Sequence, residues 1–418
     1  MVRVKNENML HVGVYVGSRG VSRIGDFMLL VAINLWVLNK THSPEAVSVL
    51  WIIPAVAQLV VTPWAGSITD RRDKRRVMIV VELIRAVLIA GMAMSSNLWL
   101  LYMALFLVNG VGSFFASASS PYVNYLVPNY RRKRVNAVLG TLQSGALIVG
   151  PALTGLILRM SGSISLAIWL DAVSFFVSAL CMATLPKLAG QRALESAAPE
   201  EKRAVNLWWN DIKIAFGVLR QRALFSFLFV VVTMSGVLGG ATDSQEAVFA
   251  RVALHLSSSA YSLLIAIAGV GYIVGALFVT IFANKMPLRL LIGTGSVIAS
   301  CGFVIYAWSH SFFTASIGFI VLGMFQSLAS AGFSTFYQFS LPSEYMGRVS
   351  NVTSPLTQIL IVVFTILVGI IVNAIGVRDT TIGSTTLMFL FGLVTLITVF
   401  STRAKGTFHS VEEQLSVG

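Results

Sequence analysis

Residues 66–76 read GSITDRRDKRR and place five Lys and Arg side chains at the junction of two long apolar runs. The preceding run is Val47–Thr69 and the following run is Val77–Met94. A helix of about 20 apolar residues is long enough to cross the hydrocarbon core of a bilayer. The stretch therefore predicts two membrane helices joined by a short basic loop.

The rest of the 418-residue chain repeats this alternation. Hydrophobic residues make up 56% of the chain and charged residues 11%, whereas soluble domains carry about a quarter charged residues. Six apolar runs precede a polar stretch and six follow it, which predicts an all-α membrane protein of twelve transmembrane helices. The other ten runs are Val12–Leu38, Leu98–Ala118, Val135–Leu158, Ile164–Leu185, Leu224–Gly240, Tyr261–Phe282, Leu288–Trp308, Phe312–Ala331, Leu356–Val377 and Ile382–Phe400.

The polar stretch divides the chain into three expected parts. Residues 1–185 form an N-terminal six-helix bundle, residues 186–222 a cytoplasmic linker, and residues 223–418 a C-terminal six-helix bundle with a cytoplasmic tail. The linker ends in an amphipathic helix with Trp209, Ile212, Phe216 and Leu219 at helical spacing. A shift of 214 residues aligns Pro128, Arg134, Val135, Leu142 and Gly155 with Pro342, Arg348, Val349, Leu356 and Gly369. This repeat indicates two pseudo-symmetric bundles of the same orientation.

The distribution of basic residues predicts the orientation. Cytoplasmic loops are enriched in Lys and Arg. If the N-terminus is cytoplasmic, most Lys and Arg fall in cytoplasmic segments, and the basic residues left for the other side are Lys40, Arg159, Arg251 and Arg378. We therefore expect a multi-pass protein of the cell membrane with both termini in the cytoplasm.

Several other classes of protein fit the chain poorly. The net charge of +13 would suit a nucleic-acid partner, but the basic residues lie in short gaps between apolar runs. Cys181 and Cys301 lie within apolar runs and the five histidines are scattered, so we expect no disulfide framework, metal site or cofactor. No phosphate-binding GxxxxGK[ST] stretch occurs, which argues against ATP-driven transport by this chain alone.

The 66–76 loop resembles the signature loop of the major facilitator superfamily, with Gly66, Asp70, Arg71, Lys74 and Arg75 at the matching positions. Asp73 replaces the second glycine of that signature, and aspartate is among the residues that tolerate a left-handed backbone. The resemblance implies that Asp70 latches one conformation by meeting the start of the eleventh helix. We expect that helix to begin at Ser354-Pro355, where its N-terminus would attract a carboxylate.

Gly150, Pro151 and Gly155 resemble a helix-bend element of exporters in this superfamily. The resemblance to the superfamily implies the major facilitator fold, and this element implies that the substrate is exported. Three further segments resemble the macrolide-efflux and enterobactin-exporter-like branch. They are Ser22–Asp26, Glu82 with Arg85, and Asp171–Phe175.

Eight ionisable residues lie within or at the edge of the predicted spans: Arg19, Arg23, Asp26, Glu82, Arg85, Asp171, Asp243 and Glu246. A charge at the bilayer centre costs roughly 2.5–3.5 kcal/mol on insertion scales, so each is expected to face a partner or a cavity. One interpretation is that Asp26 and one or both of Asp243 and Glu246 exchange protons. The other is that Arg23–Asp26 and Glu82–Arg85 are fixed ion pairs and that Asp243 and Glu246 are simply solvated.

We therefore predict a monomeric secondary transporter that couples efflux of a hydrophobic or amphipathic molecule, such as an antibiotic, to protons. An alternative is export of a siderophore or another anionic product, because Arg19 and Arg23 would suit an anionic cargo. An intramembrane enzyme is disfavoured, since no nucleophile–base pair or set of metal ligands is evident in the spans. A non-transporting receptor is disfavoured because the signature loop and the intramembrane charges are both present. No side chain is assigned a catalytic role.

Overall fold

The computed structural model describes residues 2–70, 72–127, 129–187, 212–213, 216–282, 286–341, 343–402 and 404–408. Within these ranges the secondary structure is helical, with no strand. Twelve helices are long and apolar enough to cross a membrane. The prediction of an all-α chain with twelve membrane helices is confirmed.

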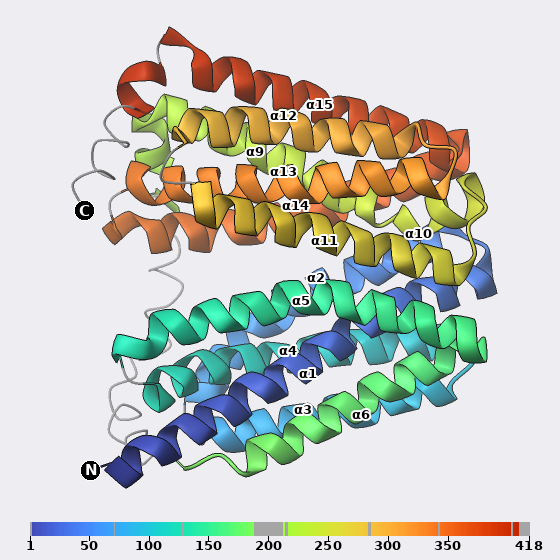
Figure 1. The fold of residues 1–418 in the computed structure, drawn as a ribbon, viewed down its shortest axis with the longest axis vertical. Coiled ribbons are helices and arrows are strands. Elements are labelled where there is room, and N and C mark those ends of the chain that lie inside the picture. Colours follow the sequence, from blue (N-terminus) through green and yellow to red (C-terminus); the bar gives the residue numbers. More distant parts are fainter. Residues whose placement is uncertain are drawn as a thin grey trace. The chain divides into compact units, whose positions relative to one another are not determined.

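The chain divides into two compact units, one of residues 1–198 with 258–266 and the other of residues 199–257 with 267–418. Unit 1 contains the first six helices (Figure 1). They are α1 (Val2–Thr41), α2 (Pro44–Asp70), α3 (Lys74–Met94), α4 (Leu98–Leu126), α5 (Asn129–Ser161) and α6 (Ile164–Ala183).

Unit 2 contains the later helices, except that the first residues of α11 belong to unit 1. They are α9 (Ala223–Asp243), α10 (Glu246–Val248), the π-helical turn η2 (Phe249–Ala253), α11 (Ser258–Phe282), α12 (Leu288–Ala307), α13 (Phe312–Ser340), α14 (Ser343–Ile375) and α15 (Val377–Phe400).

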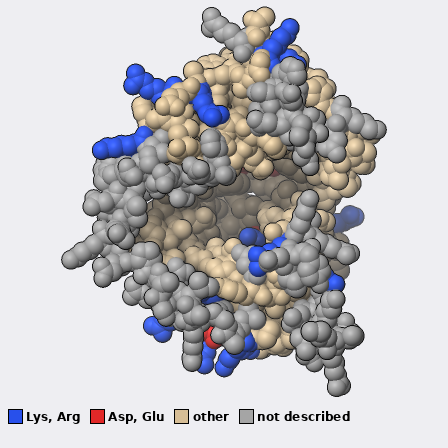
Figure 2. Space-filling model, turned by 90° about the vertical axis from the view of Figure 1, so that its left-hand side faces the viewer, with Lys and Arg blue, Asp and Glu red and all other residues tan. Residues whose placement is uncertain are grey.

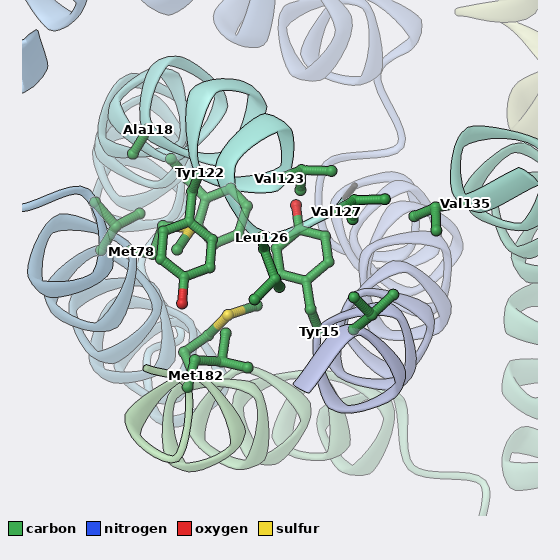
Figure 3. Packing of buried hydrophobic residues seen from close by; sticks show 13 residues of the cluster. Tyr15, Met78, Ala118, Tyr122, Val123, Leu126, Val127, Val135 and Met182 are labelled. Atoms are coloured by element: carbon green, nitrogen blue, oxygen red, sulfur yellow. The ribbon is translucent and has the colours of Figure 1, made fainter. Parts of the chain in front are cut away.

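In unit 1, α1 packs against α5 and α6, and α3 packs against α4 and α6. The core at one end of this unit is formed by buried side chains from several of these helices, which converge in Figure 3. The rings of Tyr15 and Tyr122 lie 6.5 Å apart there, and the Tyr122 hydroxyl donates to the carbonyl of Pro186 at 2.9 Å. This core fixes α1 against α4, which in turn positions the charged face of α1.

In unit 2, α12 packs against α13 and α15, and α9 packs against α14 and α15. One core cluster includes Phe225, Phe336 and Phe408, and a smaller one includes Phe303 and Met388. Of the expected amphipathic linker helix, Trp209 lies outside the described residues. Residues 216–221 are helical, Phe216 is exposed, and the neighbouring Leu219 packs against the first cluster.

The expected start of the eleventh membrane helix at Ser354-Pro355 is wrong. The helix α14 begins at Ser343 and continues through Pro355, which lies in its interior. A proline is tolerated within a membrane helix because neighbouring groups and local adjustments of the backbone can offset its missing N–H. The free helix N-terminus assumed for a latch therefore does not exist at this position.

Candidate functional site

The charged residues of unit 1 come together from three helices. Arg19, Arg23 and Asp26 follow one another at spacings of four and three along α1, so they share one face. The helices α3 and α6 pack against each other, and α6 packs against α1, which brings their charges to this face. The unit-1 charge network comprises Arg19, Arg23, Asp26, Glu82, Arg85 and Asp171.

Asp26 is the centre of this network because it accepts from two arginines. Its Oδ2 accepts from Arg23 Nη1 at 3.1 Å, and its Oδ1 accepts from Arg85 Nη2 at 2.9 Å. The Arg23–Asp26 pair lies within α1, whereas Arg85 reaches Asp26 from α3. The Arg85 guanidinium also lies over the ring of Phe175, 4.0 Å from its centroid.

The expected pair between Glu82 and Arg85 does not form. Arg85 is bound to Asp26, and Glu82 Oε1 lies 3.8 Å from Arg19 Nη1 instead. Both carboxylate oxygens of Glu82 are buried without a hydrogen-bond partner among the described residues. Spacing along one helix placed Glu82 and Arg85 on the same side, but the facing helix α1 offered each of them a partner.

Asp171 is fully buried on α6 and makes no ion pair with a described residue. Its Oδ1 accepts from Ser174 Oγ at 3.2 Å, and its Oδ2 has no hydrogen-bond partner in the described chain. It faces Gly25, where an added Cβ would lie 2.2 Å from Oδ1 of Asp171. The absence of a side chain at Gly25 therefore allows α1 to meet α6 one residue before Asp26.

A polar cavity of about 590 Å³ lies beside the network, and every described residue that lines it belongs to unit 1. Three arginines of the network face it, with amide and hydroxyl side chains from α2 and α4 around them. Asp26 is not among the described lining residues, but its partners Arg23 and Arg85 are, so the cavity lies beside the two ion pairs of Asp26. The polar lining comprises Arg19, Arg23, Gln58, Thr62, Arg85, Asn109, Ser113, Ser117 and Ser119.

The exporter-type bend contacts the same part of α1. An added Cβ at Gly150 would lie 2.6 Å from the Cβ of Phe27 and 2.8 Å from the carbonyl oxygen of Ile24. Pro151 follows inside α5, and Gly155 is buried one turn later. The close approach at Gly150 therefore brings α5 against the turn of α1 that carries Asp26.

The described part of the 66–76 loop is held by backbone contacts within unit 1. Lys74 Nζ donates to the carbonyl of Thr69 at 2.8 Å, and Arg75 donates to the carbonyls of Met182 and Ala183 on α6. Gly66 lies in α2 with open space where its Cβ would be. The side chain of Asp70 and the whole of Arg71 lie outside the described residues, as does any contact that they make.

Asp73 has a different role from the one suggested by the glycine it replaces. Its φ is −62°, so it does not adopt a left-handed backbone. It is the N-cap of α3, where its Oδ1 accepts from the backbone N–H of Arg76 at 3.2 Å. The signature loop therefore gains a helix cap at this position.

Asp243 and Glu246 lie at a break between helices of unit 2. Asp243 is the last residue of α9, Glu246 begins the short α10, and the π-helical turn η2 follows. Neither carboxylate forms an ion pair with a described residue, since the ion pairs found are all in unit 1. Burial raises the pKa of Glu246 well above its ordinary value, and the neighbouring Asp243 raises it further. Both acids are partly buried, so the interpretation that they are simply solvated is not favoured.

Sequence reasoning missed a second cavity, of about 570 Å³, which is lined by unit-2 residues including Asp243. The polar groups around it are mostly single serines, glutamines and tyrosines, which resemble ordinary packing residues in an apolar run. One available signal was the run of glycines in α9, because Gly236, Gly239 and Gly240 all line the cavity.

Comparisons with known proteins agree with this architecture. A family model described as Major Facilitator Superfamily matches residues 16–361. The uncharacterized MFS-type transporter YfiS of Bacillus subtilis is 24% identical over 393 residues, 91% of each chain. Macrolide efflux protein A of Streptococcus pyogenes is 23% identical over 411 residues, 94% of this chain and 97% of that protein. A crystal structure of a mutant of the nucleoside transporter NupG is 13% identical, with a TM-score of 0.72 over 94% of this chain and 100% of that one.

Proposed function

The chain belongs to the Major Facilitator Superfamily, and we propose that it exports a hydrophobic or amphipathic small molecule from the cytoplasm in exchange for protons. The chain is a transporter of this superfamily and not an enzyme. Two features support export as the direction. A relative over nearly the whole chain is named a macrolide efflux protein, and the bend at Gly150 and Pro151 contacts the helix that carries the charge network.

The observation that supports proton coupling most strongly is the double ion pairing of Asp26. A proton on Asp26 would neutralise the carboxylate and release Arg23 and Arg85 together. Because Arg85 belongs to α3, the proton would change a contact between two helices. A bistable contact of this kind can convert protonation into a change of conformation.

The size of this effect is sufficient for coupling. A hydrogen bond to a charged group contributes about 1.5–3 kcal/mol, and we assign that value to the Arg85 bond because the Arg85 side chain is 12% exposed. Arg23 is 41% exposed, so its pair is screened by solvent and contributes about 0.2–1 kcal/mol. Together they give about 2–4 kcal/mol, which shifts a conformational equilibrium roughly 30- to 700-fold.

We further propose that the protein is a monomer in the cell membrane with both termini in the cytoplasm. Figure 2 shows the face at which α1 begins, and blue basic side chains predominate there over red acidic ones. This distribution supports a cytoplasmic N-terminus. The division into bundles 1–185 and 223–418 with a linker 186–222 is part of the same proposal.

Export of an anionic product remains the second candidate because three arginines line the unit-1 cavity. Each of these arginines is engaged by Asp26 or Glu82, so their positive charge is largely offset. An uncharged or cationic cargo is therefore favoured over a siderophore.

Everted membrane vesicles test the proposal directly. Accumulation of macrolides and siderophores is measured with and without an imposed proton gradient. We expect wild-type vesicles to accumulate at least one macrolide-like compound only with the gradient, and the Asp26→Asn variant to lose gradient-driven accumulation. The matched control is Asp379→Asn, which removes an exposed carboxylate from the first turn of α15. Gradient-driven accumulation that is equal in Asp26→Asn and wild type would remove Asp26 from the mechanism.

A further inference from the structure

The described residues that line the unit-2 cavity all belong to unit 2. Its lining residues come from α9, α11, α12, α13, α14 and α15, and the residue contributed by α11, Tyr272, belongs to unit 2. A volume of about 570 Å³ is within the range of roughly 300–1,000 Å³ found for small-molecule sites. The cavity is therefore large enough to hold a ligand without any contribution from unit 1.

Among the described residues that line this cavity, Asp243 is the one with a charged side chain. It stands at the C-terminal end of α9, where the helix dipole adds partial negative charge. Glu246 lies close enough to act on Asp243 electrostatically, and neither is paired with a described Lys or Arg. In unit 1, by contrast, Asp26 and Glu82 both have arginine partners. The unit-2 cavity thus has an acidic side chain, without a described basic partner, at one point of its wall.

The contacts of α13 show where Asp243 lies along the cavity. The α13 residues in the lining run from Gln326 to Gln338, which corresponds to about 18 Å of helix. Near the first of these, Ser327 Oγ donates to the carbonyl of Tyr272 at 2.9 Å, and the Tyr272 hydroxyl is within electrostatic reach of Asp243. Asp243 is therefore at the Gln326 end of the unit-2 cavity.

The opposite end carries aromatic side chains together with the polar Ser334 and Gln338. Tyr337 and Phe333 of α13 line the cavity there with Met346 of α14, and the Tyr337 hydroxyl donates to the Met346 carbonyl at 3.4 Å. On the α9 side the wall leaves open space at Gly236, because an added Cβ there would meet nothing within 4 Å. Aromatic faces attract both apolar groups and organic cations.

We infer that the unit-2 cavity binds an amphipathic organic cation, with its ammonium group beside Asp243 and its apolar body between the α9 glycines and the aromatic side chains of α13. This inference rests on the proposed export function, because it states the charge of the molecule that the protein would export. Binding itself requires no proton gradient.

Fluorescence polarisation with the purified full-length protein in detergent tests the inference. The probes are a rhodamine cation and the fluorescein anion, which share a xanthene core and differ in charge. We expect the wild type to bind the cation preferentially and Asp243→Asn to weaken cation binding about tenfold or more, because a charge-assisted contact is lost. Glu246→Gln is expected to weaken it less, since Glu246 is not in the lining.

A second pair of variants tests the location of the site by volume. Gly236→Leu fills the cavity and is expected to abolish binding, whereas Gly236→Ala adds one methyl group in open space and retains it. Unchanged cation affinity in both Asp243→Asn and Gly236→Leu, or equal affinity for the anion and the cation, would overturn the inference. Asp379→Asn, which removes an exposed carboxylate of α15, is expected to bind the cation normally. Binding is measured without a proton gradient, so failure of this site and failure of proton coupling are separable.

Discussion

Replacing Gly25 by alanine tests whether the contact between α1 and α6 positions the charge network. The added Cβ would lie 2.2 Å from Asp171 Oδ1 and 2.3 Å from Ser174 Oγ, and both neighbours are buried. Neither side chain is long enough to move away without losing the hydrogen bond between them. Overpacking of this kind costs typically about 1–3 kcal/mol, and we expect the upper half of that range here because two short, buried polar groups are displaced.

The matched control is Gly17→Ala, since Gly17 lies in the same helix and its Cβ would meet nothing within 4 Å. Both substitutions gain about 1 kcal/mol of helix propensity, so their difference isolates the clash. Thermal unfolding in detergent is expected to show a lower Tm for Gly25→Ala than for Gly17→Ala. In a background of Asp171→Ala with Ser174→Ala, the penalty of Gly25→Ala should largely disappear. Equal Tm values for the two single variants would refute the proposed packing at Gly25.

Two further outcomes are expected elsewhere in the chain. Asp73→Ala should destabilise the protein by about 1 kcal/mol through loss of the α3 cap. Asp73→Asn should retain most of the stability that the cap contributes, and Tm measures both effects. Equal decreases in Tm for the two variants would argue against capping. Burial raises the pKa of Glu246 above its ordinary value of 4.5, so the folded state holds this proton more tightly than the unfolded state. The free energy of unfolding should therefore fall as pH rises from about 4.5 through the raised pKa. The variant Glu246→Gln should show a smaller decrease of Tm with pH than the wild type. An identical decrease in both proteins would exclude Glu246 as its source.

Hydropathy and charge were sufficient to predict the twelve membrane helices, because a bilayer constrains the length and composition of every helix that crosses it. They also identified the residues of the unit-1 charge network, since ionisable groups are rare in membrane spans. The partners within that network could not be predicted. Glu82 and Arg85 suit each other by spacing along α3, but packing of α1 against α6 and of α6 against α3 offers them Arg19 and Asp26 instead.

The other differences also arise from tertiary structure. Pro355 follows a serine and so indicates a helix start, yet α14 continues through it from Ser343. The unit-2 cavity depends on which faces of six helices meet, and apart from Asp243 no described residue in its lining is of a type unusual for a membrane span. Asp243 was noticed for its charge, but its position beside a cavity required the fold.

The central claim, that protons are exchanged at Asp26 as the substrate moves, is tested most directly in proteoliposomes that contain a pH-sensitive dye. Wild-type protein is predicted to move protons in the direction opposite to the substrate, with both fluxes starting together. Asp26→Asn is predicted to move substrate down its own gradient with no accompanying proton flux. Substrate movement by the wild type without a pH change, or an undiminished proton flux in Asp26→Asn, would contradict the account.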